Sequence, residues 1–163
     1  MVAKRTAIVL FNLGAPDRLA SVKPFLVNLF SDSAIINLPW PWRQLVARVI
    51  ATKRAKEACQ IYQHLGGKSP LLDNTNDQAS ALTQKTDDTN RVFVAMRYWH
   101  PQSLEVARAV KAWEPNRVVL LPLYPQYSTT TTGSSITAWK KASKAVGLET
   151  DCHIICCYPS LPG

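Results

Sequence analysis

Long apolar runs, acidic side chains and cysteines are all scarce in this 163-residue sequence. No apolar run approaches the roughly 20 residues that a membrane-spanning helix needs. No signal-peptide pattern with a small-residue cleavage site stands near Met1. The four cysteines do not follow the spacing of a disulfide framework. We therefore expect a cytoplasmic protein with free thiols.

Acidic residues are outnumbered, because 11 Asp and Glu stand against 19 Lys and Arg and give a net charge of +8. This balance favours an acidic small molecule, nucleic acid or an anionic membrane surface, although a role in solubility explains it equally well. The basic residues are scattered, with no run of five and no RNA-recognition or zinc-finger pattern. We therefore expect no nucleic-acid partner.

Hydrophobic residues make up 47% of the chain and charged residues 18%, which is typical of one globular domain with a sizeable core. Short apolar runs alternate with helical patterns. The expected strands are residues 5–13, 91–96, 117–123 and 151–158. The expected helices begin near Ser21, Arg43, Asp73, Ser103 and Ser135. This alternation predicts an α/β fold with a parallel sheet and right-handed crossovers.

Several helix details are specific enough to test. Ser21 is the expected N-cap of the first helix, and Gly147 the expected C-terminal stop of the last. The helix over residues 43–64 is expected to bury one apolar stripe: Leu45, Val46, Val49 and Ile50. The helix from Ser103 is expected to turn inward Leu104, Ala107, Val110 and Ala112 or Trp113.

Proline and tryptophan mark residues 31–42 as an irregular segment, in which Trp40 and Trp42 lie on a stiff loop. Three interpretations stay open. The indoles fold back on the core, form a lip over a flat apolar ligand, or anchor the protein at a membrane interface. The third makes the protein peripheral to the inner membrane.

The segments that follow the expected strands hold the most unusual residues. In open parallel sheets, ligands bind outside the carboxyl ends of the strands. These ends hold the Gly14 turn, Arg97 with Tyr98, residues 121–135 and Tyr158. Residues 121–135 (LPLYPQYSTTTTGSS) join an aromatic, proline-stiffened half to a hydroxyl-rich turn before a helix. This combination suits a planar ligand with anionic or polar edges.

Other candidate sites are weaker. His64 and His100 suit helix-terminal or packing roles better than catalysis. Cys152, His153, Cys156 and Cys157 alternate faces along a strand, so that one metal ion could not reach all four. Residues 65–70 (LGGKSP) lack the full spacing of a phosphate-binding loop.

Four segments together resemble one family, and they carry the resemblance across essentially all 163 residues. They are residues 12–16 (NLGAP), 66–70 (GGKSP), 96–101 (MRYWHP) and 121–135. The chain resembles the N-terminal half of ferrochelatases, which insert ferrous iron into a porphyrin in haem synthesis. The resemblance implies a Rossmann-like chelatase fold of two similar halves around a porphyrin cleft. Residues 1–163 would form the N-terminal half, and the C-terminal half would be absent.

The resemblance also implies porphyrin-binding residues. Leu13 would line the porphyrin face near the metal path, and Arg54 and Ser69 would hold a propionate. Arg97 and Tyr98 would contact the macrocycle or support the metal side of the pocket. The cleft wall would be formed by Tyr124, Tyr127, Ser128 and Thr129. Some family members hold an iron–sulfur cluster through a cysteine at the position of Thr129, so we expect no cluster and no permanently bound cofactor.

The resemblance places the catalytic His and its partner Glu in the second half of the family, which no segment here matches. We therefore expect no catalytic residue in this chain, slow or no metal insertion by the chain alone, and self-association through exposed surface. Protoporphyrin IX and coproporphyrin III remain alternative substrates beside ferrous iron. A non-catalytic porphyrin or haem carrier is the alternative function. A phosphosugar- or nucleotide-binding domain is a third hypothesis, which the aromatic residues of 121–135 disfavour.

Overall fold

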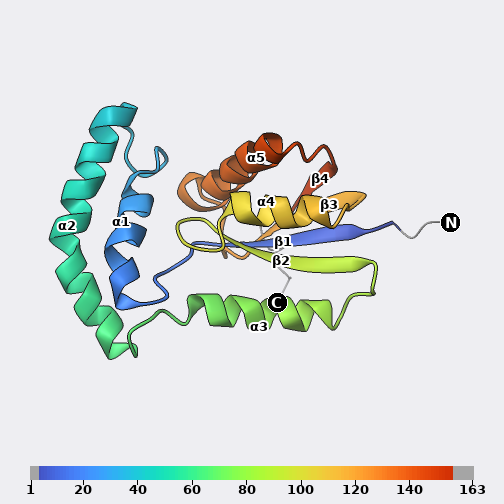
Figure 1. The fold of residues 1–163 in the computed structure, drawn as a ribbon, viewed down its shortest axis with the longest axis horizontal. Helices are drawn as coiled ribbons and strands as arrows, with labels where there is room; N and C mark the ends of the chain where they lie inside the picture. The colour runs from blue at the N-terminus through green and yellow to red at the C-terminus, as the bar shows by residue number, and fades with distance from the viewer. Residues whose placement is uncertain (1–3, 156–163) are drawn as a thin grey trace. The chain divides into compact units, whose positions relative to one another are not determined.

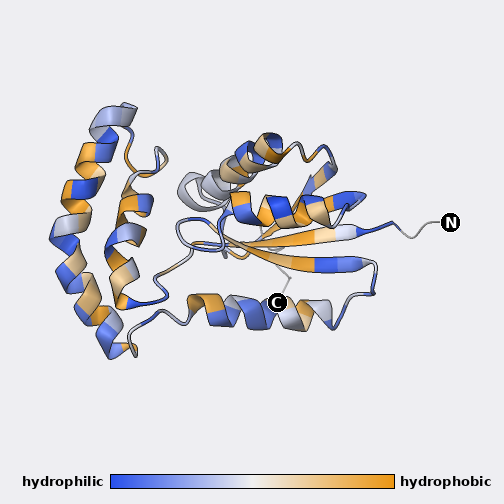
Figure 2. Cartoon of the chain, in the orientation of Figure 1, coloured by the Kyte–Doolittle hydropathy of each residue, from blue (hydrophilic) through white to orange (hydrophobic). Residues whose placement is uncertain are grey.

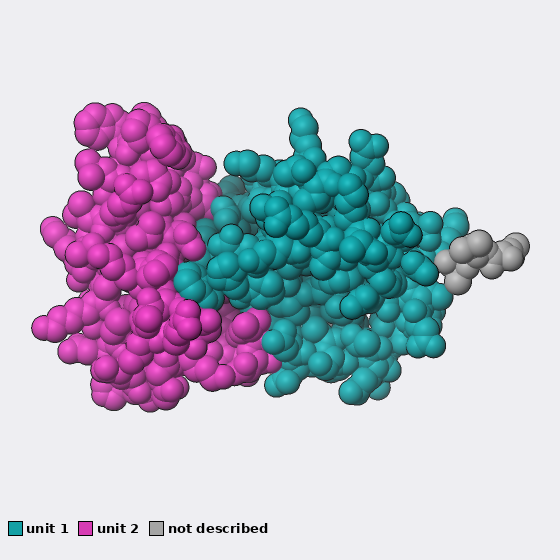
Figure 3. Space-filling model, in the orientation of Figure 1, with its two compact units in different colours: residues 1–13, 75–163 teal, residues 14–74 magenta. Residues whose placement is uncertain are grey.

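The computed structural model describes residues 4–155 of the chain. The chain divides into two compact units (Figure 3). One comprises residues 1–13 and 75–163, and the other residues 14–74. Each unit is described by itself below.

The first unit is built on a four-stranded parallel sheet, as the sequence predicts. Its strands are β1 (Thr6–Asn12), β2 (Asn90–Met96), β3 (Arg117–Pro122) and β4 (Asp151–Ile154). They are ordered β2-β1-β3-β4, which makes β1 an inner strand with a parallel neighbour on each side. The register pairs Leu10 of β1 with Val94 of β2 and with Leu121 of β3.

The order of the strands decides which face of the sheet each helix of this unit covers. The connection from β1 to β2 runs in one direction along the sheet, and those from β2 to β3 and from β3 to β4 run in the other. Right-handed crossovers therefore place α3 (Leu71–Thr83) on one face and α4 (Ser103–Ala112) and α5 (Ser134–Val146) on the other (Figure 1). The sheet is thus covered on both faces.

The main core lies between the sheet and the α4–α5 layer. Val9 and Phe11 of β1 and Leu120 of β3 point into it, and Trp139 of α5 meets Phe11 edge to face at 5.9 Å between ring centroids. Leu10, which points to the other face, is also buried. Apolar residues are concentrated in the carboxyl-terminal parts of β1 and β2 (Figure 2). Burial on both faces explains the continuous apolar runs of these strands.

The second unit contains a helical hairpin formed by α1 (Val22–Phe30) and α2 (Trp40–His64), preceded by the short 3-10 segment η1 (Leu19–Ser21). Ser21 does occupy the N-cap position of α1. Its hydroxyl, however, donates to Asp17 Oδ1 at 2.5 Å and makes no capping hydrogen bond.

Two predictions for α2 are wrong. The segment before Arg43 is not irregular up to Trp42, because α2 begins at Trp40 with Pro41 in its first turn, where proline needs no amide partner. The expected apolar stripe is not the buried one. Ala47 and Ala51 are buried, whereas Leu45 and Val49 are exposed. Small side chains allow close contact between helices, and this contact decided which face of α2 turned inward.

The buried face of α4 and the ends of α5 and β4 also bear on the predictions. Leu104 of α4 is exposed and not inward, because Val106, Ala107 and Val110 occupy the buried face. Gly147 ends α5 in the left-handed conformation at φ 64°, as expected for a C-terminal stop. The fourth strand ends at Ile154, earlier than predicted, while Cys156, Cys157 and Tyr158 lie outside the described residues. No helix among residues 4–155 is long and apolar enough to cross a membrane.

Candidate functional site at the carboxyl end of the sheet

The chain leaves β1 and its two neighbours at the same edge of the sheet. β2 lies on one side of β1 and β3 on the other, so the connections that follow β1 and β2 leave this edge in opposite directions. Open α/β sheets bind ligands at such a switch point. Backbone hydrogen bonds hold the three exits together. Tyr98 N donates to Leu13 O at 2.9 Å, and Leu123 N donates to Phe11 O at 2.8 Å. The predicted convergence of the segments after β1, β2 and β3 is therefore confirmed.

Arg97 lies directly after β2 and is half-buried. Its backbone N donates to Asn12 O at 2.9 Å, and its Nε donates to Ser134 Oγ at 2.6 Å. The guanidinium carbon also lies 4.8 Å from the centroid of the Tyr98 ring. Arg97 is thus held by β1, by its neighbour and by the first residue of α5, so its positive charge has a defined place at the edge of the sheet.

Tyr98 and Tyr124 were expected to contact the ligand directly, but the two residues are only 1% and 7% exposed. Tyr98 Oη donates to Thr130 O at 3.4 Å. Tyr124 Oη shares a buried hydrogen bond of 2.9 Å with Ser135 Oγ. Both rings therefore support the wall from within and offer little surface for direct contact.

The ionisation of Tyr124 follows from this burial. Desolvation raises the pKa of the Tyr124 phenol above its usual value, and the hydrogen bond from Ser135 and the charge of Arg97 offset part of that rise. Tyr124 therefore stays protonated and neutral at pH 7, where it can take part in hydrogen bonds but cannot act as a base.

The hydroxyl-rich turn adopts a short π-helical segment, η2 (Thr129–Gly133), that leads into α5. Ser128 caps it, because its Oγ accepts from Thr130 N at 3.2 Å and contacts Thr130 Oγ1 at 2.9 Å. Thr129 is exposed and Ser128 half-buried. Tyr127 is 56% exposed, and its Oη lies 3.4 Å from where a Cβ on Gly133 would stand. Tyr127 is therefore the accessible aromatic ring of this wall.

Leu13 completes this group of predicted residues. It is half-buried, packs against the core and follows β1. Asn12 fixes the local backbone by accepting from Leu13 N through Oδ1 at 2.8 Å and donating to Thr75 Oγ1 at 3.0 Å. Seven of the nine predicted site residues thus belong to the first unit: Leu13, Arg97, Tyr98, Tyr124, Tyr127, Ser128 and Thr129.

The remaining two predicted residues, Arg54 and Ser69, lie in the second unit. Arg54 is exposed in the middle of α2. Ser69 lies in the turn after α2, where its N donates to Pro16 O at 2.9 Å and its Oγ accepts from Leu71 N at 3.2 Å. Both side chains are accessible within the second unit, which suits a cation and a hydroxyl that bind an anion.

Sequence reasoning missed Ser134 and Ser135 as partners of the site. We predicted only a dense set of donors in this turn and did not assign their contacts. Both serines are buried, at 5% and 1% exposed. The sequence did offer one signal for them. Two adjacent serines stand in the first turn of a helix that follows a parallel strand, and this turn lies at the carboxyl edge of the sheet.

His64 and His100 each contact a residue nearby in the chain, and His153 lies in β4. His64 ends α2 and contacts Gln60 O at 2.7 Å through Nδ1. His100 pairs with Glu105 Oε1 at 2.8 Å, and Glu105 also accepts from Gln102 N at the start of α4. Within residues 4–155, no three His, Cys, Asp or Glu side chains gather as metal ligands.

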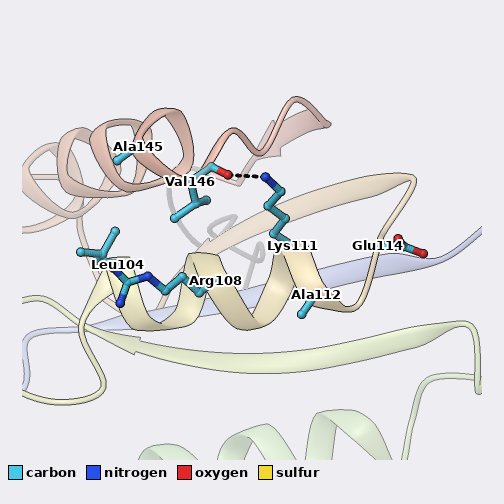
Figure 4. Close-up of a pocket in the computed structure, with 7 residues that line it drawn as sticks. All are labelled: Leu104, Arg108, Lys111, Ala112, Glu114, Ala145 and Val146. Atoms are coloured by element: carbon cyan, nitrogen blue, oxygen red, sulfur yellow. Dashed lines mark hydrogen bonds between the residues drawn. The ribbon is translucent and has the colours of Figure 1, made fainter.

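A separate hollow of about 630 Å³ lies between α4 and α5 (Figure 4). Its lining includes Leu104, Arg108 and Lys111 of α4, and Lys111 Nζ donates to Val146 O at 2.5 Å. Lys111 and Val146 come shortly before β3 and β4, so this part of the hollow is at the amino edge of the sheet. None of the nine predicted site residues lines it.

The fold defines a Rossmann-like α/β domain, and the carboxyl edge of its sheet gathers aromatic, hydroxyl and guanidinium groups. The family model "Ferrochelatase" matches residues 5–163. The chain belongs to the ferrochelatase family.

Curated relatives support the same assignment. The chain is 52% identical over 155 residues to a ferrochelatase of Wolbachia sp. subsp. Drosophila simulans (strain wRi), covering 93% of this chain and 49% of the relative. It is 50% identical over 160 residues to one of Rickettsia bellii (strain OSU 85-389), covering 96% and 44%. It is 51% identical over 164 residues to one of Phenylobacterium zucineum (strain HLK1), covering 98% and 47%. The chain spans about half the length of these relatives.

Proposed function

We propose that these residues supply one wall of a porphyrin site in an enzyme that inserts ferrous iron into protoporphyrin IX or coproporphyrin III to make haem. The observation that carries the proposal is the hydrogen-bonded convergence of Leu13, Arg97 and residues 121–135 at the switch point of a ferrochelatase-family sheet. Porphyrin and ferrous iron are the substrates in this proposal.

The chemistry of the wall suits a porphyrin, which is flat and apolar at its centre and anionic at its propionates. Leu13 and the exposed ring of Tyr127 offer apolar contact, and Ser128 and Thr129 offer hydroxyls beside them. Tyr98 and Tyr124 hold the wall from within through Thr130 and Ser135. Arg54 and Ser69 bind a propionate in this proposal, as a cation and a hydroxyl donor.

Metal insertion requires that two pyrrole protons leave while the metal enters. Tyr124 is neutral at pH 7 because its pKa is raised, and the His100 ring is engaged by Glu105. We therefore assign to these residues the binding and orientation of the porphyrin, and no part in accepting its protons. Thr129 presents a hydroxyl and no thiolate, so this position does not fit an iron–sulfur cluster.

A Soret-band titration with metal-free protoporphyrin IX and coproporphyrin III tests the binding proposal. Saturable binding that is weakened in Tyr127→Ser supports it, and the absence of a spectral shift with both porphyrins contradicts it. Binding without metal insertion, when zinc is added as a surrogate for iron, also fits the alternative of a porphyrin or haem carrier. Reconstitution of insertion by adding the second half of a ferrochelatase relative would decide for the enzyme.

A further proposal concerns the exposed start of α2. Trp40 and Trp42 are 69% and 63% exposed, and Leu45 and Val49 extend the apolar surface along the helix. Arg48, Lys53 and Lys56 are exposed on the same helix. Indole rings combined with nearby cations suit the interface of an anionic bilayer. We therefore propose peripheral membrane contact through Trp40 and Trp42 of a cytoplasmic protein.

A further inference from the structure

The first turn of α5 carries two adjacent serines that each bind a side chain from a different strand exit. Ser134 Oγ accepts from Arg97 Nε at 2.6 Å, and Arg97 follows β2. Ser135 Oγ bonds Tyr124 Oη at 2.9 Å, and Tyr124 follows β3. β2 and β3 lie on opposite sides of β1, so this one helical turn links the exits on both sides of Leu13.

Burial makes these contacts costly to lose. Both serines and Tyr124 are less than 9% exposed, and a buried hydroxyl that loses its partner pays the full cost of its desolvation. A buried polar group therefore selects the arrangement in which its partner is in reach. Each serine fixes one partner, and because the serines are consecutive on a helix, the two partners are also fixed relative to each other.

Arg97 and Ser135 both act on the buried Tyr124 phenol. Arg97 lowers the pKa of Tyr124 as well as bonding Ser134, and Ser135 lowers the same pKa through its hydrogen bond. A shift of α5 would therefore disturb the guanidinium and the phenol together. Both contacts are made to side chains that follow other strands, which makes the role of the serines one of placement.

We propose that Ser134 and Ser135 are positioning residues that preform the porphyrin wall by holding Arg97 and Tyr124 across the end of β1. This inference rests on the proposed porphyrin site. It assigns to α5 a role beyond packing, because the helix sets the separation between the charge of Arg97 and the ring of Tyr124.

The test uses the 163-residue chain with Ser134→Ala, Ser135→Ala and Ser143→Ala as the matched control. Ser143 lies on the same helix, and its Oγ donates to Lys140 O at 3.1 Å. Loss of one positioning hydrogen bond is expected to weaken protoporphyrin IX binding about 3- to 10-fold in the first two variants. Ser143→Ala should bind like the unaltered chain.

A second measurement reports on position without porphyrin. The NMR signal of the Arg97 Nε–H group should exchange with water several-fold faster in Ser134→Ala, and remain unchanged in Ser143→Ala. Arg97→Lys keeps the charge but removes the Nε donor. In that background, Ser134→Ala should cause no further loss of affinity, whereas a general loss of packing would add to it.

The outcomes distinguish failure of the positioning role from failure of the proposed function. If the unaltered chain binds porphyrin and both serine variants bind as tightly as Ser143→Ala, the positioning role is wrong and the proposed function stands. If the unaltered chain binds no porphyrin, the proposed function is wrong and this inference falls with it. Should Ser135→Ala fail to fold, the Ser134→Ala and Arg97→Lys comparison still decides the matter.

Discussion

Charge and hydroxyl groups at single positions carry the ligand chemistry proposed here. Arg97 is held by backbone and side-chain partners, whereas Arg54 stands exposed on α2. A fixed guanidinium contributes direction as well as charge, because its planar donors match a carboxylate in one orientation. An exposed one contributes mainly charge. The two arginines should therefore respond differently to substitution and to salt.

Arg54→Ala is expected to weaken porphyrin binding about 3- to 10-fold, because one charge-assisted contact to a propionate is lost at an exposed site. Raising the salt concentration should reduce the difference. Arg48→Ala removes an exposed cation from the same helix and is the control. Equal losses in both variants, measured by Soret titration, would show a general effect of charge and no propionate contact.

Tyr124 also predicts how stability depends on pH. Its folded-state pKa is raised, so the folded chain keeps the phenol proton at a pH where the unfolded chain, with a pKa of about 10, loses it. This contribution is complete below about pH 10 and is lost as the pH rises above that value. Tyr124→Phe should lower stability at pH 8, because Ser135 loses its partner, but should flatten the decline between pH 10 and 11.

Urea unfolding from pH 8 to 11 measures this effect, with Tyr127→Phe at an exposed position as the control. The control should follow the unaltered chain at each pH. A decline in Tyr124→Phe as steep as that of the unaltered chain would mean that another group causes the alkaline loss of stability.

At the scale of elements, β1 is the strand on which the first unit depends. It pairs with β2 and β3 and supplies residues to both faces of the sheet. α2 differs from it, since it presents much of its apolar surface to solvent. Equivalent apolar substitutions in the two elements should therefore have very different consequences.

Phe11→Ala should destabilise the chain by about 3–5 kcal/mol, because the change leaves a cavity beside Trp139 in the core. Ile61→Ala, on the exposed surface of α2, should change the free energy of unfolding by no more than about 0.5 kcal/mol. Urea denaturation measures both. A small effect of Phe11→Ala would contradict the packing of β1 described above.

The exposed indoles of α2 lead to a prediction about membranes. Replacing both Trp40 and Trp42 by serine should lower affinity for vesicles of phosphatidylglycerol and phosphatidylcholine by at least about tenfold, since each buried indole contributes more than 1 kcal/mol. Ile61→Ser, near the other end of the helix, is the control. Unchanged vesicle binding would exclude this contact. A change in sedimentation instead would assign the indoles to self-association.

At the scale of the whole molecule, the proposed porphyrin wall has binding groups without an assigned proton acceptor. The chain spans about half the length of its relatives, at 49% of the Wolbachia wRi protein. In our proposal, these residues bind and orient the porphyrin and take no part in accepting its protons. Binding and metal insertion should therefore be separable.

The 163-residue chain alone should convert protoporphyrin IX to its zinc complex no faster than the porphyrin and zinc without protein. The fluorescence of the zinc porphyrin measures this directly. A ferrochelatase of full length is the positive control. Brisk insertion by the chain alone would show that a proton acceptor lies within these residues and would overturn the assignment made above.

The sequence predicted much of the fold because parallel strands buried on both faces have a local signature. The apolar runs of β1 and β2, the stop at Gly147 and the unusual residues after each strand could all be recognised without the structure. Strand direction and order then bring the exits together, since parallel strands end at one edge. Recognition of the site residues also depended on family resemblance, as no single local pattern names a porphyrin.

The tertiary structure decided what depends on distant neighbours. The sequence of α2 offers both a stripe of large apolar residues and a stripe of alanines. Close packing between helices buried Ala47 and Ala51 and left Leu45 and Val49 exposed. Tyr98 and Tyr124 proved to be buried supports, because residues of the turn and of α5 reach their hydroxyls. The sequence by itself determined the strands and the chemistry at their ends. Only the structure decided which of these side chains are exposed and which are buried, because burial is set by residues far apart in the chain.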